Sequence, residues 1–212
     1  MHAMNVLVFG ATGPTGSLVA QQALERGHSV TAFVRDPAGL ALRHERLRVV
    51  TGDTTRDASA IAEAMRGEEA VVSALGRRTT LKSGHLIERS LRLIVPAMAG
   101  AGVRRLMLLS AFGVGDSYRE APLVPRIMYR VLLSDIFADK KAGEDLVRQS
   151  GLDWTFVYPV LLTDGPLTGR YRADEHLELH GLPKISRADV AHFIANELEQ
   201  GAYVRKTAVL SY

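Results

Sequence analysis

The sequence predicts an α/β protein whose parallel sheet is covered by helices on both faces. Short runs rich in Val, Leu and Phe alternate along the 212 residues with longer segments of helical periodicity. The runs are largely unbroken by polar residues, as expected of strands buried on both faces. A chain of this length can bury a full core without disulfide bonds, and the sequence has no cysteine. These three observations predict a doubly wound sheet.

Six strands and five helices are expected. The strands are predicted at residues 5–9, 29–34, 47–50, 70–74, 105–109 and 154–157. The helices are predicted at residues 15–26, 58–65, 85–99, 136–149 and 187–199. Asp36 precedes a proline, Gly100 and Gly102 follow the third helix, and Ser186 with Asp189 resembles a capping box. Because no repeat or linker interrupts the pattern, one domain spanning residues 1–212 is expected.

The charge pattern argues against nucleic acid as a partner. The formal net charge is +3, but the arginines are scattered and no basic run is interleaved with aromatic residues. The first apolar stretch is too short for a signal peptide, and no stretch is long enough to span a membrane. We therefore expect a cytoplasmic protein without membrane contact. A pocket that holds an anionic ligand would add to the basic charge.

A glycine-rich loop follows the first predicted strand and opens the first helix. Gly10 permits a sharp exit from the strand, Gly13 lets the backbone approach a pyrophosphate, and Gly16 allows the helix to pack closely. The free N–H groups and positive dipole end of the helix then attract the phosphates. The residues expected to bind the cofactor here are Gly10, Thr12, Gly13, Pro14, Thr15 and Gly16. The alternative is a glycine-rich turn without a ligand. The GxxGxxG spacing is typical of short-chain dehydrogenases.

The second strand ends in Arg35, which favours NADP(H) over NAD(H). A dinucleotide site that prefers NAD has an acidic residue at this point for the ribose 2′-hydroxyl, whereas a guanidinium can pair with a 2′-phosphate. The alternative is an ordinary surface arginine. Asp53 and Thr54 follow the third strand, where a carboxylate could accept a hydrogen bond from the adenine amino group. Leu75, Gly76 and Arg78 follow the fourth strand, beside the expected ribose.

Taken together, these motifs resemble the atypical short-chain dehydrogenases of the NAD(P)H-binding, NmrA-like group, and within it the flavin reductase (biliverdin IXβ reductase) branch. The resemblance covers nearly the whole chain. The segments that carry it are 10–16, 34–36, 52–53, 75–76, 110–112, 150–152, 158–159, 164–169 and 185–189. The resemblance implies a monomer with an open pocket that transfers hydride from NADPH to a flat acceptor, a flavin or a linear tetrapyrrole.

The resemblance also implies which residues flank the nicotinamide. Ser110, Ala111 and Phe112 would lie beside it, and Pro159, Val160 and Leu161 would line its other side. A substrate-side segment is expected at about residues 159–185. The flavin reductases carry a histidine shortly after the proline of the sixth strand, whereas this chain has Val160-Leu-Leu162. This departure puts recognition of a tetrapyrrole in doubt.

The Tyr-x-x-x-Lys pair of the tyrosine-dependent short-chain dehydrogenases is absent. Lys140 lies in the corresponding helix, but Ile136 occupies the tyrosine position. This disfavours ketone reduction and favours a flavin or quinone-like acceptor, for which the protein mainly supplies proximity and orientation. Ser110 and Lys140 are the candidate catalytic residues. The alternatives are a serine that bonds local backbone and a solvated lysine. Phe112 and Tyr158 could stack on a flat substrate or pack in the core.

Two other functions stay open at this point. A non-catalytic NADP(H) sensor of the NmrA-like type also fits the missing tyrosine. An enzyme that modifies sugar nucleotides or terpenoids is disfavoured, because the region after Pro159 is small for such a substrate. His176 and His180 stand four residues apart among acidic residues, but no third ligand is identifiable, so no metal is expected.

Overall fold

An eight-stranded sheet forms the middle layer of the protein, with strand order β3-β2-β1-β4-β5-β6-β10-β8. The computed structural model describes residues 2–77, 80, 82–115, 117 and 133–212. The strands of this sheet are β1 (Asn5–Phe9), β2 (Ser29–Val34), β3 (Leu47–Thr51), β4 (Ala70–Ser73), β5 (Arg105–Leu109), β6 (Asp153–Pro159), β8 (Arg172–Asp174) and β10 (Lys206–Ser211). Only β8 runs antiparallel to its neighbour, and the other pairs are parallel.

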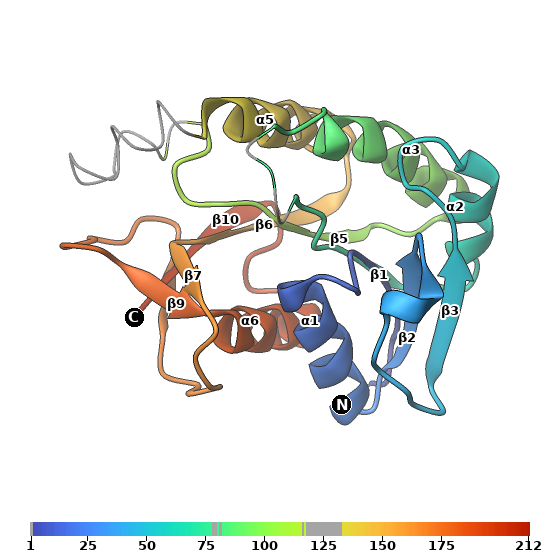
Figure 1. The fold of residues 1–212 in the computed structure, drawn as a ribbon, viewed down its shortest axis with the longest axis horizontal. Coiled ribbons are helices and arrows are strands. Elements are labelled where there is room, and N and C mark those ends of the chain that lie inside the picture. The colour runs from blue at the N-terminus through green and yellow to red at the C-terminus, as the bar shows by residue number, and fades with distance from the viewer. Residues whose placement is uncertain (1, 78–79, 81, 116, 118–132) are drawn as a thin grey trace.

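Helices cover both faces of the sheet in the described part of the chain. They are α1 (Pro14–Glu25), α2 (Ala58–Ala64), α3 (Leu86–Ala101), α5 (Ser134–Gln149) and α6 (Arg187–Gln200). Figure 1 shows α2, α3 and α5 on one face and α1 with α6 on the other. A short 3₁₀ turn, η1 (Pro37–Gly39), follows β2, and a separate parallel pair is formed by β7 (Leu161–Thr163) and β9 (Lys184–Ser186). No described helix is long and apolar enough to cross a membrane.

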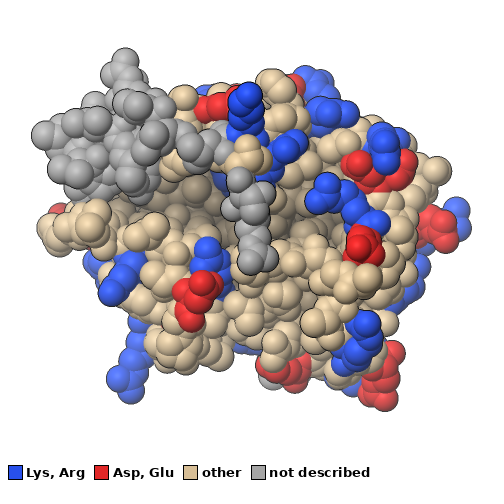
Figure 2. Space-filling model, viewed as in Figure 1, with Lys and Arg blue, Asp and Glu red and all other residues tan. Residues whose placement is uncertain are grey.

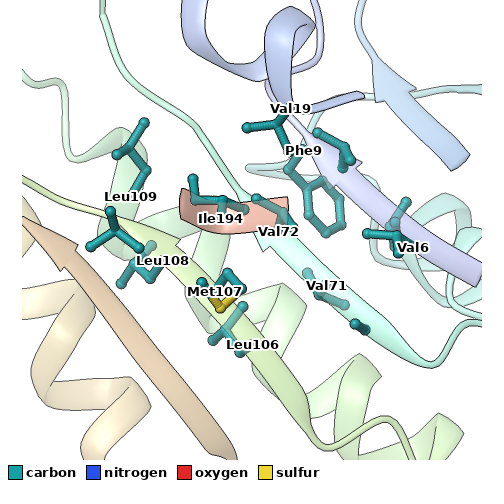
Figure 3. Packing of buried hydrophobic residues seen from close by; sticks show 14 of the residues in the cluster. Val6, Phe9, Val19, Val71, Val72, Leu106, Met107, Leu108, Leu109 and Ile194 are labelled. Carbon is teal, nitrogen blue, oxygen red and sulfur yellow. The ribbon is translucent and has the colours of Figure 1, made fainter. Parts of the chain in front are cut away.

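The central strands supply most of the core. Val6 to Phe9 of β1, Val71 and Val72 of β4 and Leu106 to Leu108 of β5 are almost fully buried. Figure 3 shows Val6, Phe9, Val71, Val72 and Leu106 to Leu108 packed with Val19 of α1 and Ile194 of α6. Because helices cover both faces, each of these strands is apolar at successive positions instead of alternating with polar residues. The doubly wound fold predicted from this pattern is confirmed.

The predicted elements correspond to β1–β6 and to α1, α2, α3, α5 and α6, with ends that differ by a few residues. Three details were wrong. The third strand was expected to be buried on both faces, but β3 is the edge of the sheet and Val49 is 41% exposed. Gly100 lies inside α3, and Gly102 alone caps it with φ of +73°. The strands β7 to β10 were not predicted: β7, β8 and β9 have only three residues each, and the six-residue β10 was missed.

The strand order reverses between β1 and β4, and this reversal positions the site. From β1 the chain proceeds outward through β2 and β3, whereas β4, β5 and β6 follow on the opposite side. The crossover connections after β1 and β4 therefore leave the sheet in opposite directions, and a crevice opens at the carboxyl ends of these strands. Ligands of doubly wound proteins bind in this crevice, which is bordered by the loops that follow β1, β2, β4, β5 and β6.

Candidate functional site

The loop between β1 and α1 has a backbone that requires its first and third glycines. Gly10 has φ of +84°, and a Cβ there would lie 2.6 Å from the carbonyl oxygen of Ala74, which follows β4. A Cβ on Gly16 would overlap the carbonyl oxygen of Gly10. A Cβ on Gly13 meets only that same oxygen, at 3.2 Å. The loop fold thus depends on Gly10 and Gly16, whereas Gly13 leaves an open surface above the helix start.

The amino end of α1 is available to an anion. Gly13 is its N-cap residue, and no described side chain caps the helix. The first N–H groups of a helix have no acceptor within the helix, so an uncapped amino end attracts phosphate. Pro14 and Thr12 are exposed and Thr15 is buried. The γ-methyl group of Thr12 lies 3.7 Å from the position of a Cβ on Gly39, so this loop borders the turn after β2. These residues surround the uncapped start of α1, which we call the cradle, where free N–H groups could receive a pyrophosphate.

Arg35, at the end of β2, is exposed and lies near the carboxylate of Asp53. Within the described residues it makes no ion pair or hydrogen bond. Asp53 Oδ1 accepts hydrogen bonds from the backbone N–H of Thr55 at 2.9 Å and from its hydroxyl at 2.7 Å, which lower the pKa of Asp53. Asp53 Oδ2 lies 3.5 Å from Arg56. One carboxylate oxygen is therefore occupied by the local turn, and the other lies beside Arg56.

The remaining predicted residues on this side differ in their access to the crevice. Thr54 is buried, and its hydroxyl accepts a hydrogen bond from Ser90 of α3 at 2.8 Å, so its side chain points into the protein. Asp36 caps η1 by accepting from the N–H of Ala38, as predicted. Leu75 is half-buried and Gly76 is exposed after β4. Arg78 lies outside the described residues.

A buried carboxylate connects α5 with the ends of β5 and β6. Ser110 follows β5 and Tyr158 lies in β6, and the hydroxyl group of each donates to Glu144 of α5 at 2.6 Å. Arg148 donates to the same carboxylate at 3.2 Å. The side chain of Glu144 is 0% exposed. Burial raises the pKa of Glu144, and the hydrogen bonds from Ser110, Tyr158 and Arg148 oppose that rise. Tyr158 therefore belongs to an interior polar network, not to a stacking surface.

Lys140 lies one helical turn before Glu144, on the same face of α5. Its ammonium group donates to the carbonyl oxygen of Leu109, the last residue of β5, at 3.3 Å. Burial lowers the pKa of Lys140 to about 8, although the charges of Glu144 and Asp139 act in the opposite direction. The lysine is half-buried, so it is not a fully solvated helix residue. It places an ammonium group that can lose its proton near neutral pH at the end of the strand that Ser110 follows.

The segments after β5 and β6 are joined by backbone hydrogen bonds. The N–H of Ser110 donates to Val157 at 2.9 Å, and the N–H of Phe112 donates to Pro159 at 3.0 Å. Phe112 is buried, so it packs in the core, and Ala111 is half-buried. Val160 is also buried, whereas Leu161 of β7 is 58% exposed. The structure thus brings residues 110–112 and 159–160 together, and the exposed Leu161 follows them in β7.

Two functional features were missed from the sequence. Glu144 has a detectable signal, because its spacing of four from Lys140 places both residues on one face of a helix. Asp139 accepts hydrogen bonds from the N–H groups of Ile87 and Glu88 and so caps α3 from a neighbouring helix. Nothing in the local sequence indicates that contact, because the donors lie about fifty residues away.

Metal ligation has weak support among the described residues. His176 and His180 lie in an irregular segment, so their spacing of four does not place them on one face of a helix. One other group, His85, Glu88 and Asp139, has ligand atoms within 4.8 Å of one another. Both oxygens of Asp139 already accept backbone hydrogen bonds, so that group serves the start of α3.

On the face shown in Figure 2, basic side chains are interspersed with acidic ones, and the described residues form no continuous basic band. Between the charged residues the surface is mainly uncharged, and it is hollowed near its middle. The fold, the uncapped amino end of α1 and the polar groups after β5 together define a class: proteins that bind a nicotinamide dinucleotide at the carboxyl edge of a doubly wound sheet.

Comparison with known proteins gives the family. The chain belongs to the NAD(P)H-binding family, whose model matches residues 10–201. It is 32% identical over 154 residues to the (4-alkanoyl-5-oxo-2,5-dihydrofuran-3-yl)methyl phosphate reductase of Streptomyces griseus, covering 73% of this chain and 46% of that protein. It is 30% identical over 174 residues to an uncharacterised chloroplastic protein of Arabidopsis thaliana, covering 77% of this chain and 61% of that one. The chain therefore spans less than two thirds of the length of either relative.

Solved structures share the fold over the full chain. The anaerobillin reductase ChuY of Escherichia coli O157:H7 superposes with a TM-score of 0.80 and 26% identity, covering 97% of this chain and 96% of that one. The prediction of an NAD(P)H-binding relative of the atypical short-chain dehydrogenases is confirmed.

Proposed function

We propose that the protein is an NADPH-dependent reductase that transfers hydride to a flat acceptor such as a flavin. The observation that carries the proposal is the placement of Lys140 and Ser110 at the end of β5, on the same edge of the sheet as the uncapped amino end of α1. A cofactor whose pyrophosphate lies at that helix end would extend its nicotinamide along this edge toward β5. Relatives that are reductases, in Streptomyces griseus and Escherichia coli, support the same reaction class.

Different residues of the chain bind the cofactor and supply the proton. Gly10, Gly13 and Gly16 shape the phosphate cradle, and Arg35 pairs with the 2′-phosphate of NADPH. Bound NADPH supplies the hydride. Ser110 orients the nicotinamide end, and Lys140 supplies the proton that accompanies the hydride to the acceptor. Residues of about 159–185 form the substrate side, where the exposed Leu161 presents an apolar surface to a flat ring system.

The choice of acceptor follows from what the site lacks. Ile136, half-buried on α5, occupies the position at which a tyrosine would protonate a carbonyl oxygen. A flavin accepts hydride at an electrophilic ring nitrogen and needs no phenol beside it. Proximity and orientation by the protein then account for most of the rate.

The test is oxidation of NADPH by the purified protein in the presence of FMN, FAD, riboflavin, a quinone or a linear tetrapyrrole, followed at the nicotinamide absorbance band. We expect turnover with at least one flavin. Tight NADPH binding without turnover of any of these acceptors would contradict the reductase and favour a cofactor-sensing protein, the alternative that the absent tyrosine also permits.

Two glycine variants distinguish a loss of cofactor binding from a loss of folding. In Gly13→Ala the added methyl group lies 3.2 Å from the carbonyl oxygen of Gly10, a contact that a small shift of the loop relieves, and it occupies the cradle, so we expect a folded protein that no longer binds NADPH. Gly16→Ala forces its methyl group onto the carbonyl of Gly10, so we expect a loss of both folding stability and binding. Turnover that survives in a folded Gly13→Ala protein would place the chemistry elsewhere.

A further inference from the structure

Glu144 is an ionisable group at the centre of the proposed site that cofactor binding does not explain. Its carboxylate is fully shielded from solvent. It receives Ser110 on one oxygen, and Tyr158 together with Arg148 on the other. An ion this deeply buried is costly unless its partners compensate it, and the contacts supply that compensation. The contacts with Glu144 therefore determine where the hydroxyl protons of Ser110 and Tyr158 lie.

In the structure the hydroxyl groups of Ser110 and Tyr158 both donate to Glu144. This is the direction that an ionised carboxylate, which can only accept, requires. The two distances of 2.6 Å are typical of O–H groups that donate to a negative oxygen. Burial, followed by the charge of Glu144, raises the pKa of Tyr158, so the phenol keeps its proton. A serine hydroxyl has one proton, and once that proton is donated only lone pairs remain for other partners.

The charges that face Glu144 maintain this arrangement. Lys140 and Arg148 lie one turn before and one turn after it on α5, and both are positive. Asp139 lies near Lys140 but is occupied by backbone N–H groups of α3. The side of α3 that packs against this part of α5 presents apolar atoms of Ile87 and Leu91 beside Gly143. Two cations and two hydroxyl donors thus surround one carboxylate.

We propose that Glu144 is a positioning residue that holds the protons of Ser110 and Tyr158, so that Ser110 acts as a hydrogen-bond acceptor toward the amide N–H of the nicotinamide carboxamide. Of the described residues in this network, Lys140 is then the group left to supply a proton. This inference rests on the proposed function, since it assigns a direction to a contact that the bound nicotinamide would make.

A cofactor analogue can read the direction of that hydrogen bond. The 3-acetylpyridine analogue of NADPH has a methyl group in place of the amide NH₂, so it can accept a hydrogen bond but cannot donate one. We expect the wild-type protein to bind NADPH about tenfold more tightly than the analogue, as the loss of one hydrogen bond implies. Binding is measured by titration calorimetry without an acceptor, so the result does not depend on turnover.

The variants separate positioning from simple packing. In Glu144→Gln an amide NH₂ replaces one of the two carboxylate oxygens. A hydroxyl group that donated to that oxygen can no longer do so, and its proton must point elsewhere. We expect the preference for NADPH to fall to within about twofold in Glu144→Gln and in Ser110→Ala. The double variant should show no further change. Tyr158→Phe should keep the preference, because Ser110 still donates to Glu144.

The matched control is Glu197→Gln on α6. Glu197 is also a buried glutamate that pairs with an arginine, Arg105, at 2.9 Å. Arg105 begins β5, so this pair lies at the opposite end of that strand from Ser110. We expect Glu197→Gln to lose stability and to keep the wild-type preference. If Glu144→Gln does not fold, Glu144→Met, which offers no strong acceptor, is measured in its place.

Each outcome decides the inference. An unchanged preference in a folded Glu144 variant would overturn it, and so would a wild-type protein that binds both dinucleotides equally. A wild-type protein that binds neither would overturn both this inference and the proposed function. If the preference responds as expected but no acceptor is reduced, the positioning role stands and the reductase assignment fails.

Discussion

Lys140 places a titratable ammonium group at the end of the strand that Ser110 follows. Its ammonium group reaches the carbonyl of Leu109 at the end of β5, and burial lowers its pKa to about 8. A lysine on a solvated helix would titrate at about 10.4 and would stay charged throughout the physiological range. A general acid works best when its pKa lies close to the working pH, and Lys140 satisfies that condition.

We expect the rate of acceptor reduction to fall as the pH rises through about 8, because Lys140 loses the proton that it must supply. Lys140→Met should lower kcat by roughly 100-fold and remove this pH dependence, the usual effect of losing a general acid. NADPH binding should change little. The measurement is a pH–rate profile of both proteins, and a profile that is flat across pH 8 in the wild type would contradict the assignment.

The same shift in the pKa of Lys140 has a consequence for stability. Because the folded-state pKa is below the unfolded value, the buried ammonium opposes folding below pH 8, and the penalty disappears as the pH rises toward the unfolded pKa. Lys140→Met should therefore raise Tm at pH 7, and this difference from the wild type should shrink by pH 10. Thermal unfolding at the two pH values measures it.

Arg35 is expected to decide between the two nicotinamide dinucleotides. It is exposed at the end of β2, close to Asp53, where the adenosine ribose of a bound cofactor would lie. Arg35→Glu replaces a partner of the 2′-phosphate by a repelling charge, so affinity for NADPH should fall by about 100-fold while affinity for NADH stays within a few-fold. Arg56→Glu, a nearby arginine beyond β3, is the control for a general charge effect. Equal losses of both cofactors in Arg35→Glu would remove this residue from the site.

Helix α5 holds two neighbouring parts of the candidate site in place. Asp139 caps the amino end of α3, and Glu144 receives the side chains that follow β5 and lie in β6. Gly143 lies between them, where a Cβ would come within 2.8 Å of Ile87 and Leu91 side chains, so α3 and α5 pack closely. A single helix thus fixes the start of α3 and the polar groups at the carboxyl edge of the sheet.

Removing the Asp139 cap should destabilise the protein markedly. In Asp139→Ala the buried N–H of Ile87 and the half-buried N–H of Glu88 lose their acceptor, which we expect to lower the free energy of unfolding by about 2–3 kcal/mol. Asp145 of the same helix forms only surface ion pairs with Lys141 and Arg148, so Asp145→Ala should cost less than about 1 kcal/mol. Urea unfolding of the two variants measures the difference, and equal midpoints would refute the capping role.

The elements themselves were largely predictable from the sequence, because the inner strands are continuous apolar runs and the helices have clear periodicity. The phosphate loop could also be predicted, since its glycines lie between such a strand and such a helix. The short strands β7, β8 and β9 could not, because three residues are too few to show a period. The Glu144 network was out of reach for a different reason: residues 110, 144 and 158 meet only after three elements have packed.

Asp189 connects the segment between β6 and α6 to the main sheet. Its carboxylate accepts hydrogen bonds from Thr168, Gly169, Ser186 and Tyr212. Burial opposes ionisation, but the hydrogen bonds from Tyr212, Gly169 and Thr168 outweigh it and hold the pKa of Asp189 below its ordinary value. The predicted capping by Ser186 is confirmed, since its hydroxyl accepts from the N–H of Asp189 at 3.0 Å. One carboxylate thus anchors the proposed substrate side.

Asp189→Asn should loosen this segment while the rest of the protein stays folded. An amide cannot accept all of these hydrogen bonds, so local opening should become easier by about 1–2 kcal/mol and protease cleavage between residues 164 and 186 roughly tenfold faster. The KM for the acceptor should rise without a change in NADPH affinity. Asp174→Asn on the exposed strand β8 serves as the control, and equal cleavage rates in the two variants would contradict the anchoring role.

The reversal of strand order between β1 and β4 has a consequence beyond the placement of the crevice. A dinucleotide that spans this point touches loops from both halves of the sheet and so joins segments that are distant in the chain. Ligand that binds only the folded form stabilises it by about 2.7 kcal/mol when its free concentration is a hundred times the Kd. The resistance of this protein to unfolding in a cell should therefore follow the supply of its nicotinamide coenzyme.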